Sequence, residues 1–100
     1  MKRLATEYFA YLLLCADGTY YAGYTDNLTR RLRAHNNGTG ARYTRSRGPV
    51  TLAHFEAFLT KGEAMRQEYR FKQLTHQQKA LLCSAEPVQS SPENNTKADA

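Results

Sequence analysis

The hydrophobic positions of the chain fall into three short runs, each typical of a β-strand. Residues 8–15 are apolar at successive positions and rich in aromatic side chains, which indicates a central strand. Residues 19–24 form a second, tyrosine-rich strand, and the intervening Asp17-Gly18 is a strong hairpin signal. Residues 50–59 alternate and predict a third strand with one mixed face and one apolar row, made of Ala53, Phe55, Ala57 and Leu59.

Helical signals separate and follow these strands. Thr25 or Asp26 can cap a first helix that runs to about Asn36, where an Asn-Gly dipeptide ends it. Residues 38–49 are then expected to form a loop. Thr60 followed by Glu63 fits a capping box that starts a second helix, which continues to about residue 74.

The end of the sequence divides into a last helix and a polar tail. A short helix is expected to start at Thr75 or His76 and to end near Cys83. The order strand-strand-helix-strand-helix-helix predicts an α+β fold, in which helices flank a small three-stranded antiparallel sheet. Residues 1–83 would form this single domain. Residues 84–100 carry too few apolar side chains to bury, and they predict a disordered tail.

The charge is concentrated in the part of the chain that is expected to fold. The whole chain has a net charge of +5, but residues 1–83 hold 13 basic and 6 acidic side chains, and residues 84–100 hold 1 and 3. A basic domain of this kind favours polyanions such as nucleic acid. No acidic residue lies between Asp26 and Glu56, and this gap contains the candidate phosphate-binding and base-stacking side chains Arg30, Arg33, Arg42, Tyr43, Arg45 and Arg47.

Three further positions could carry chemistry. Arg31 and His35 are four residues apart and share one helix face, where a guanidinium could neutralise a phosphate and an imidazole could move a proton. Glu68 falls in an apolar stripe between Ala64 and Phe71, where a carboxylate needs an ion pair or a metal ion. The sequence leaves both readings of Glu68 open, and an Arg-His pair is also common on an ordinary helix surface.

The hairpin tyrosines depend on strand register. A two-residue turn would pair Leu14 with Tyr21 and would place Tyr11 and Tyr21 on opposite faces of the sheet. A three-residue loop would pair Leu13 with Tyr21 and would place both tyrosines on one face. A shared site requires the second arrangement or a bulge.

Other classes of protein are disfavoured. The two cysteines do not form a disulfide framework, and Cys15 after an apolar run predicts a buried thiol. The longest apolar stretch is much shorter than the roughly 20 residues of a membrane helix. We therefore expect a cytoplasmic protein with no membrane contact and no organic cofactor.

In order and spacing, Tyr11, Tyr21, Arg31, His35 and Glu68 resemble the GIY-YIG endonuclease superfamily. That family has two hairpin tyrosines, an arginine ten residues after the second, a histidine or tyrosine four residues later, and a glutamate on the following helix. The resemblance spans about residues 8–83 and is strongest to short stand-alone bacterial members. It implies a phosphodiester-cleaving enzyme that acts on nucleic acid, DNA rather than RNA.

The resemblance also implies a role for each of these residues. Tyr21 would activate the attacking water with Tyr11 beside it, and Arg31 would stabilise the pentavalent phosphate. His35 would orient groups or relay a proton. Glu68 would hold one Mg²⁺ or Mn²⁺.

Two features depart from the family pattern. The first motif reads Phe9-Ala10-Tyr11 and lacks the family's glycine, and the late asparagine of several relatives has no clear counterpart. The alternative is therefore a nucleic-acid-binding module that keeps the scaffold and cuts weakly or not at all.

Overall fold

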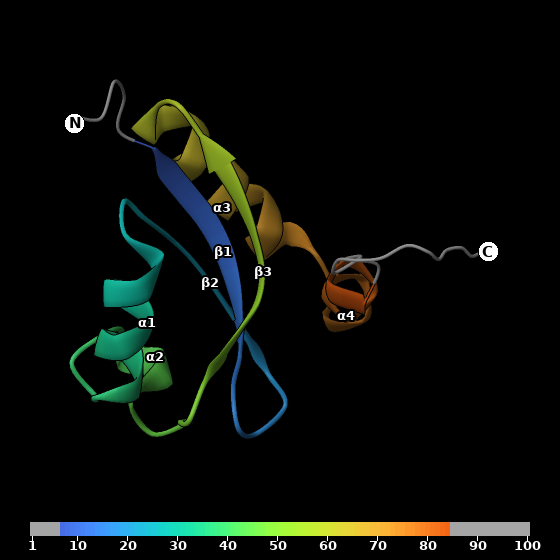
Figure 1. Cartoon of the computed structure of the whole chain (residues 1–100). Coiled ribbons are helices and arrows are strands. Elements are labelled where there is room, and N and C mark those ends of the chain that lie inside the picture. The colour runs from blue at the N-terminus through green and yellow to red at the C-terminus, as the bar shows by residue number, and fades with distance from the viewer. Residues whose placement is uncertain (1–6, 85–100) are drawn as a thin grey trace, which may run out of the picture.

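The computed structural model describes residues 7–84, which form one three-stranded antiparallel sheet with helices on both sides. The strands are β1 (Tyr8–Leu14), β2 (Tyr20–Thr25) and β3 (Thr51–Phe58), in the order β2-β1-β3 (Figure 1). The apolar run at the start of the chain is the central strand, as predicted. Its middle residues are almost fully buried: Ala10, Tyr11, Leu12 and Leu13.

The hairpin between β1 and β2 has the register that places both tyrosines on one face. Leu13 lies opposite Tyr21, and the Cys15 N–H donates to the Thr19 carbonyl oxygen at 2.8 Å, which leaves a three-residue loop. Gly18 closes this loop with φ of +86°, a left-handed conformation that favours glycine. The three-residue loop, which places Tyr11 and Tyr21 on one face of the sheet, is therefore confirmed.

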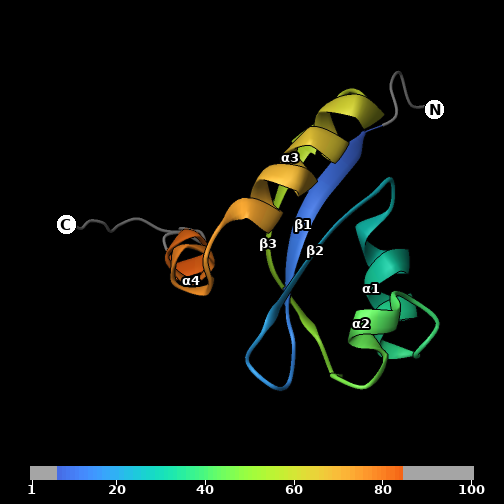
Figure 2. The ribbon, with the colours of Figure 1, turned by 180° about the vertical axis from the view of Figure 1, so that it is seen from behind.

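The helices cover the sheet from two sides. α1 (Leu28–Asn36) and the short α2 (Arg42–Arg45) lie on one side, and α3 (Lys61–Gln73) packs on the other. Figure 2 shows from behind that α4 (His76–Ser84) follows α3 at the far end of the chain. The α+β class and the flanked three-stranded sheet are confirmed.

Two apolar clusters fill the spaces between these layers. On the α3 side, Phe71 packs with Ala10, Leu12 and Ala22. On the α1 side, the buried residues are Tyr11, Leu13, Cys15 and Val50. Cys15 is a buried free thiol, as predicted. Tyr11 thus belongs to the core on the side of the sheet where α1 lies.

The first helix is capped by a residue other than those predicted. The side chain of Asn27 accepts the Arg30 N–H at 2.9 Å and is the N-cap. The Thr25 hydroxyl instead accepts the Asn27 N–H at 3.1 Å, and the Asp26 carboxylate pairs with the Arg30 side chain. The expected cap at Thr25 or Asp26 is wrong because the Thr25 oxygen serves the turn before the helix and the Asp26 oxygen binds a side chain of the helix.

The expected loop over residues 38–49 contains the four-residue helix α2. A single helical turn is too short to show a hydrophobic period, so the sequence pattern does not reveal it. Asn36 fixes the other end of this segment. Its side chain accepts the Val50 N–H at 2.7 Å and donates to the Val50 carbonyl oxygen at 3.1 Å, so it holds α1 to the start of β3.

The apolar row predicted for β3 is only partly covered. Phe55 is 48% exposed and Leu59 is 70% exposed, whereas His54 of the mixed face is buried and contacts the Phe71 ring. The irregularity in the β1–β3 pairing lies between Leu12 and Leu13, so the alternation from His54 to Phe58 is regular. The mixed face is the buried one because α3 packs against it: His54 contacts Phe71, and Phe58 packs against the same cluster.

The two C-terminal helices start as expected. Thr60 and Glu63 form the predicted capping box, and Thr75 makes a similar pair of bonds with Gln78 at the start of α4. No helix within residues 7–84 is long and apolar enough to cross a membrane. Apart from Ser84, the predicted polar tail lies outside the described residues.

Candidate active site

A pocket of about 460 Å³ opens along the edge strand β2. Because β2 is at the edge of the sheet, side chains from α1 and from α3 both reach it. Four of the predicted catalytic residues line it together: Tyr11, Tyr21, Arg31 and Glu68. The other lining residues are Gly23, Tyr24, Thr25, Arg30 and Ala34. Three consecutive elements, β1, β2 and α1, therefore meet the distant helix α3 at one cavity.

His35 lies behind this pocket. It is 1% exposed, and its Nε2 is 3.0 Å from the Tyr11 hydroxyl. On the other side of the ring, Nδ1 is 2.8 Å from the hydroxyl of Thr44, which is also buried. His35 therefore reaches the pocket through Tyr11, and Thr44 completes a buried chain of three side chains.

Counting donors assigns the directions of these bonds. The Thr44 hydroxyl donates to the Ala41 carbonyl oxygen at 3.0 Å, so it accepts from the Nδ1–H of His35. Nε2 is then an acceptor for the Tyr11 hydroxyl. The contact from Ala41 N–H to Nδ1, at 3.5 Å, lies at the outer limit of a hydrogen bond. With its proton directed to His35, Tyr11 has lone pairs left to face the pocket.

The protonation of this chain follows from burial. Burial, with the nearby Arg31 charge, lowers the pKa of His35 to about 4, so the ring is neutral near pH 7. Burial also raises the pKa of Tyr11 above its usual value, although the Arg31 guanidinium opposes this rise. The proton therefore stays on Tyr11, and His35 holds the phenol in place without removing its proton.

Two glycines leave room for this chain, and sequence reasoning did not single them out. A Cβ added to Gly23 would lie 2.5 Å from the Tyr11 hydroxyl oxygen. A Cβ added to Gly40 would lie 2.7 Å from Nδ1 and 2.9 Å from Cα of His35. Gly23 lies two residues after Tyr21 in β2, and nothing in the local pattern marks its contact with Tyr11. Thr44 gave no signal, because its contact with His35 forms only where the chain reverses between α1 and α2.

Arg31 supplies the positive charge of the pocket. It is partly buried on α1, beside Tyr11 and at the mouth formed by β2. Among residues 7–84 it forms no ion pair, in contrast to Arg30, whose guanidinium is 2.9 Å from the Asp26 carboxylate. A guanidinium that no carboxylate neutralises is suited to a phosphate.

Glu68 is the carboxylate of the pocket. Its side chain is 19% exposed, and Lys72, one turn later on α3, lies 3.3 Å from its Oε2. No group of three or more His, Cys, Asp or Glu side chains that could hold a metal ion occurs in the described part of the chain. A metal ion held by Glu68 would therefore need water or substrate oxygens as its other ligands.

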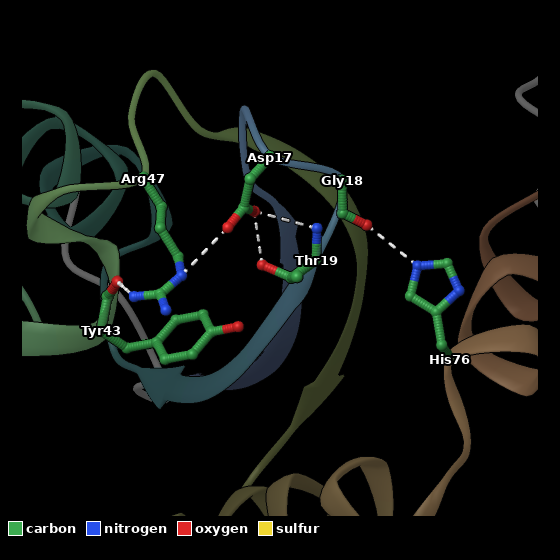
Figure 3. A network of polar contacts seen from close by, with 6 residues as sticks. All are labelled: Asp17, Gly18, Thr19, Tyr43, Arg47 and His76. Atoms are coloured by element: carbon green, nitrogen blue, oxygen red, sulfur yellow. Dashed lines mark hydrogen bonds and ion pairs between the residues drawn. The ribbon is translucent and has the colours of Figure 1, made fainter.

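A network of polar contacts connects Tyr43 of α2 and Arg47 to the loop between β1 and β2 (Figure 3). Tyr43 stacks on Tyr21 with ring centroids 5.9 Å apart, and the Arg47 guanidinium lies 4.0 Å from the centre of the Tyr43 ring. Arg47 also donates to the Asp17 carboxylate at 3.1 Å. Hydrogen bonds from Thr19 are the main cause that lowers the pKa of Asp17. Arg47 thus connects Tyr43 to Asp17 in the structure, in addition to the phosphate binding predicted for it.

The remaining predicted phosphate-binding residues lie outside the pocket. Arg33 is exposed in the last turn of α1, and Arg42 and Arg45 are exposed on α2. Arg30 is the one arginine of the predicted binding set that also lines the pocket. The structure therefore brings the catalytic set together and spreads the other arginines over α1 and α2 beside it.

Comparisons with known proteins agree with this arrangement. The family described as the GIY-YIG catalytic domain matches residues 7–80. A UPF0213 protein of Bacillus velezensis is 60% identical over 73% of this chain and 74% of its own length. A UPF0213 protein of Halobacterium salinarum is 58% identical over 72% of this chain and 94% of its own length.

Solved structures show the same similarity. The solution NMR structure of a UPF0213 protein from Bacillus halodurans has a TM-score of 0.51 and 45% identity, over 80% of this chain and 85% of that one. A solution NMR structure from E. faecalis has a TM-score of 0.55 and 41% identity, over 89% and 95% of the two chains. The chain therefore belongs to the GIY-YIG catalytic-domain family and groups within it with the UPF0213 proteins.

Proposed function

We propose that the chain is a divalent-metal-dependent endonuclease that hydrolyses phosphodiester bonds in DNA. One observation carries the proposal: Tyr11, Tyr21, Arg31 and Glu68 come from four separate elements and line one pocket. Phosphodiester hydrolysis needs a group that activates water, a cation for the developing phosphate charge and a site for a metal ion. These four side chains offer each of the three.

The two tyrosines have different tasks. Tyr11 is held by His35 and keeps its proton, since its pKa is raised. Tyr21 also lines the pocket, and its ring is fixed between His35, at 5.3 Å, and Tyr43. Tyr21 is therefore the group that activates the attacking water. Tyr11 accepts a hydrogen bond from that water or from a water nearby and fixes its position.

Arg31 stabilises the charge that builds up on the phosphate. The two non-bridging oxygens gain negative charge as the nucleophile attacks, and a guanidinium can donate to both. Arg31 is already in place on α1 and does not need to leave another carboxylate. Its position beside Tyr11 brings the positive charge close to the attacking water.

Glu68 is the residue that would hold the metal ion. When bound, a divalent ion supplies a positive charge that stabilises the leaving oxygen. Lys72 pairs with the Glu68 carboxylate at 3.3 Å, so it keeps that charge compensated until a cation replaces it. Mg²⁺ or Mn²⁺ is the expected ion, because both accept oxygen ligands and retain water.

The arginines on α1 and α2 provide the surface that attracts the substrate. Exposed positive charges beside a reactive pocket contact phosphates of any sequence and make binding depend on salt. This surface consists of Arg30, Arg33, Arg42 and Arg45. We propose DNA as the polymer, and an RNA arm in the assay tests this choice.

A second candidate function is a nucleic-acid-binding module with little or no turnover. The ion pair between Lys72 and Glu68 favours it, since an ammonium group at 3.3 Å occupies the carboxylate that a metal ion would need. This candidate predicts salt-dependent binding without cleavage. It also predicts that adding Mg²⁺ or Mn²⁺ leaves the substrate intact.

A cleavage assay separates the two functions. Supercoiled plasmid and end-labelled single-stranded, duplex and branched DNA and RNA are incubated with Mg²⁺, with Mn²⁺ or with EDTA. The endonuclease predicts cuts that need metal and are lost in Arg31→Ala. Binding without cuts in any arm, or equal cutting by Arg31→Ala, would overturn the proposal.

A further inference from the structure

A second, smaller pocket adjoins the candidate active site on the other side of Tyr21. Its volume is about 220 Å³, and it has aromatic and basic walls: Tyr20, Tyr21, Ala22, Tyr43, Lys72 and Lys79. Tyr21 lines both pockets. Lys72 lines the second pocket and pairs with Glu68 of the first. The two cavities are therefore neighbours that share one side chain and are linked by an ion pair.

Two aromatic walls of this pocket are held in place by the same turn. Tyr43 lies against Arg47, which binds Asp17, and Tyr20 lies against His76, with ring centroids 5.2 Å apart. The His76 Nε2 atom is 2.9 Å from the Gly18 carbonyl oxygen. Figure 3 shows how Asp17 and Gly18 connect the residues after α2 to the start of α4. Rings fixed in this way can stack on a ligand at a low entropic cost.

The charged side chains that line this second pocket are all basic. Lys72 and Lys79 come from α3 and α4, and no acidic side chain of the described residues lines the pocket. Lys79 forms no ion pair within residues 7–84. Aromatic rings next to ammonium groups are the combination that binds a nucleobase and its phosphate without reading the sequence.

The size of the pocket indicates part of a strand as the ligand. Pockets that enclose a whole small molecule usually measure about 300–1,000 Å³, and this one is smaller and shallow. We infer that it binds one unstacked nucleotide of the substrate strand, next to the phosphate that lies in the active site. This inference rests on the proposed function, because it places the strand across both pockets. It adds Tyr20, Lys72 and Lys79 to the binding residues.

Binding measured without cleavage tests this inference. Fluorescence anisotropy with a labelled oligothymidylate of about 12 nucleotides in EDTA reports affinity at several salt concentrations. Lys79→Gln should weaken binding and reduce the magnitude of the salt slope by about 0.7, the value for one lost phosphate contact on a single strand. Tyr20→Leu, which keeps an apolar side chain in the core, should weaken binding at least about 5-fold through lost stacking.

Arg66→Gln is the matched control, because it also removes one positive charge and Arg66 lines a pocket that shares no residue with this one or with the candidate active site. It should bind as the wild type does, and circular dichroism should show that all variants remain folded. If Lys79→Gln and Tyr20→Leu also bind as the wild type does, the inference is overturned, whether or not the protein cuts DNA. Binding that depends on Lys79, in a protein that never cuts, supports this pocket and contradicts the nuclease. Equal affinity for thymidine monophosphate and for the oligomer would contradict the placement of a strand.

Discussion

The two walls of the candidate active site differ in how completely their polar groups are satisfied. On the wall behind Tyr11, His35 and Thr44 are each about 1% exposed, and each polar atom of this chain has a protein partner. On the α3 side, Lys72 is the one ion-pair partner of Glu68 among the described residues, and this pair is partly open to solvent. Arg31 has no carboxylate partner among the described residues.

This difference indicates which parts of the site are fixed before the substrate arrives. A buried chain of hydrogen bonds has one favourable arrangement, so it sets the position of the Tyr11 phenol. Arg31 of α1 and Glu68 of α3 line the pocket from the two sides of the sheet, and their charges are the ones that a phosphate and a metal ion would satisfy. The buried chain of hydrogen bonds therefore provides geometry, and these two side chains provide charge.

The largest effect is expected from a substitution at Gly23 that disturbs the hydrogen-bonded pair of Tyr11 and His35. In Gly23→Ala the new methyl group would meet the Tyr11 hydroxyl, which His35 prevents from moving freely. We expect a loss of about 1–3 kcal/mol in unfolding free energy and a fall of at least about 100-fold in single-turnover cleavage rate. Denaturant melts and a cleavage time course measure the two effects.

Gly62→Ala is the control for this substitution. Its Cβ would meet only Arg66 Nη1, at 3.7 Å, which is an ordinary contact. It should leave cleavage unchanged. If Gly23→Ala cuts as fast as Gly62→Ala, the position of Tyr11 does not matter to the reaction.

A smaller effect on the unfolding free energy is expected from a change in pH, through the buried side chain of His35. The folded pKa of His35 is about 4, below the ordinary value near 6.5 that it regains on unfolding. The unfolded state therefore binds more protons between these values, so this histidine's contribution to stability is complete above about pH 6.5 and is lost as the pH falls toward 4. His35→Gln should reduce the difference in unfolding free energy between about pH 7 and pH 5.

His76→Gln, which changes an exposed histidine, is the comparison for that measurement. Both variants remove one imidazole, and of the two rings His35 is the buried one. An unchanged pH dependence in His35→Gln would show that the ring is not held neutral by the fold.

The smallest effect on stability is expected at Arg30, an exposed residue that lines the candidate active site. Its pair with Asp26 is solvent-exposed, so Arg30→Ala should change the unfolding free energy by no more than about 0.5 kcal/mol. It should reduce the salt slope of DNA binding by about 1, because one phosphate contact is removed. Asp26→Asn breaks the same ion pair and keeps the arginine, so it should leave that slope unchanged. Equal slopes in Arg30→Ala and wild type would contradict a phosphate contact.

The sequence predicted the sheet and its helices because their signals are local. The apolar run of β1, the capping box at Thr60 and the hairpin at Asp17-Gly18 each depend on neighbouring residues. The hairpin register needed the structure, since two loop lengths fitted the same dipeptide. The α1 cap was misplaced because Thr25, Asp26 and Asn27 are all good caps, and local hydrogen bonds decide among them.

The pocket residues were predictable from two sources: the spacing shared with the GIY-YIG family, which gave Tyr11 and Tyr21, and local anomalies in the sequence. Glu68 in an apolar stripe and Arg31 in a stretch without acidic residues were such anomalies, and both line the pocket. Thr44 and Gly40 gave no signal, because each acts on His35 across a chain reversal. Burial of His35 behind Tyr11 also could not be read from its spacing to Arg31.

The most direct test of the account is a metal titration of single-turnover DNA cleavage by the wild type and by Glu68→Gln. Glu68→Gln keeps the shape of the side chain and removes the charge that would hold the ion. We expect metal-dependent cutting by the wild type and none by Glu68→Gln at any Mg²⁺ or Mn²⁺ concentration, with DNA binding in EDTA retained by both. Equal cutting by the two proteins would show that the pocket works without its carboxylate and would rule out the proposed metal site.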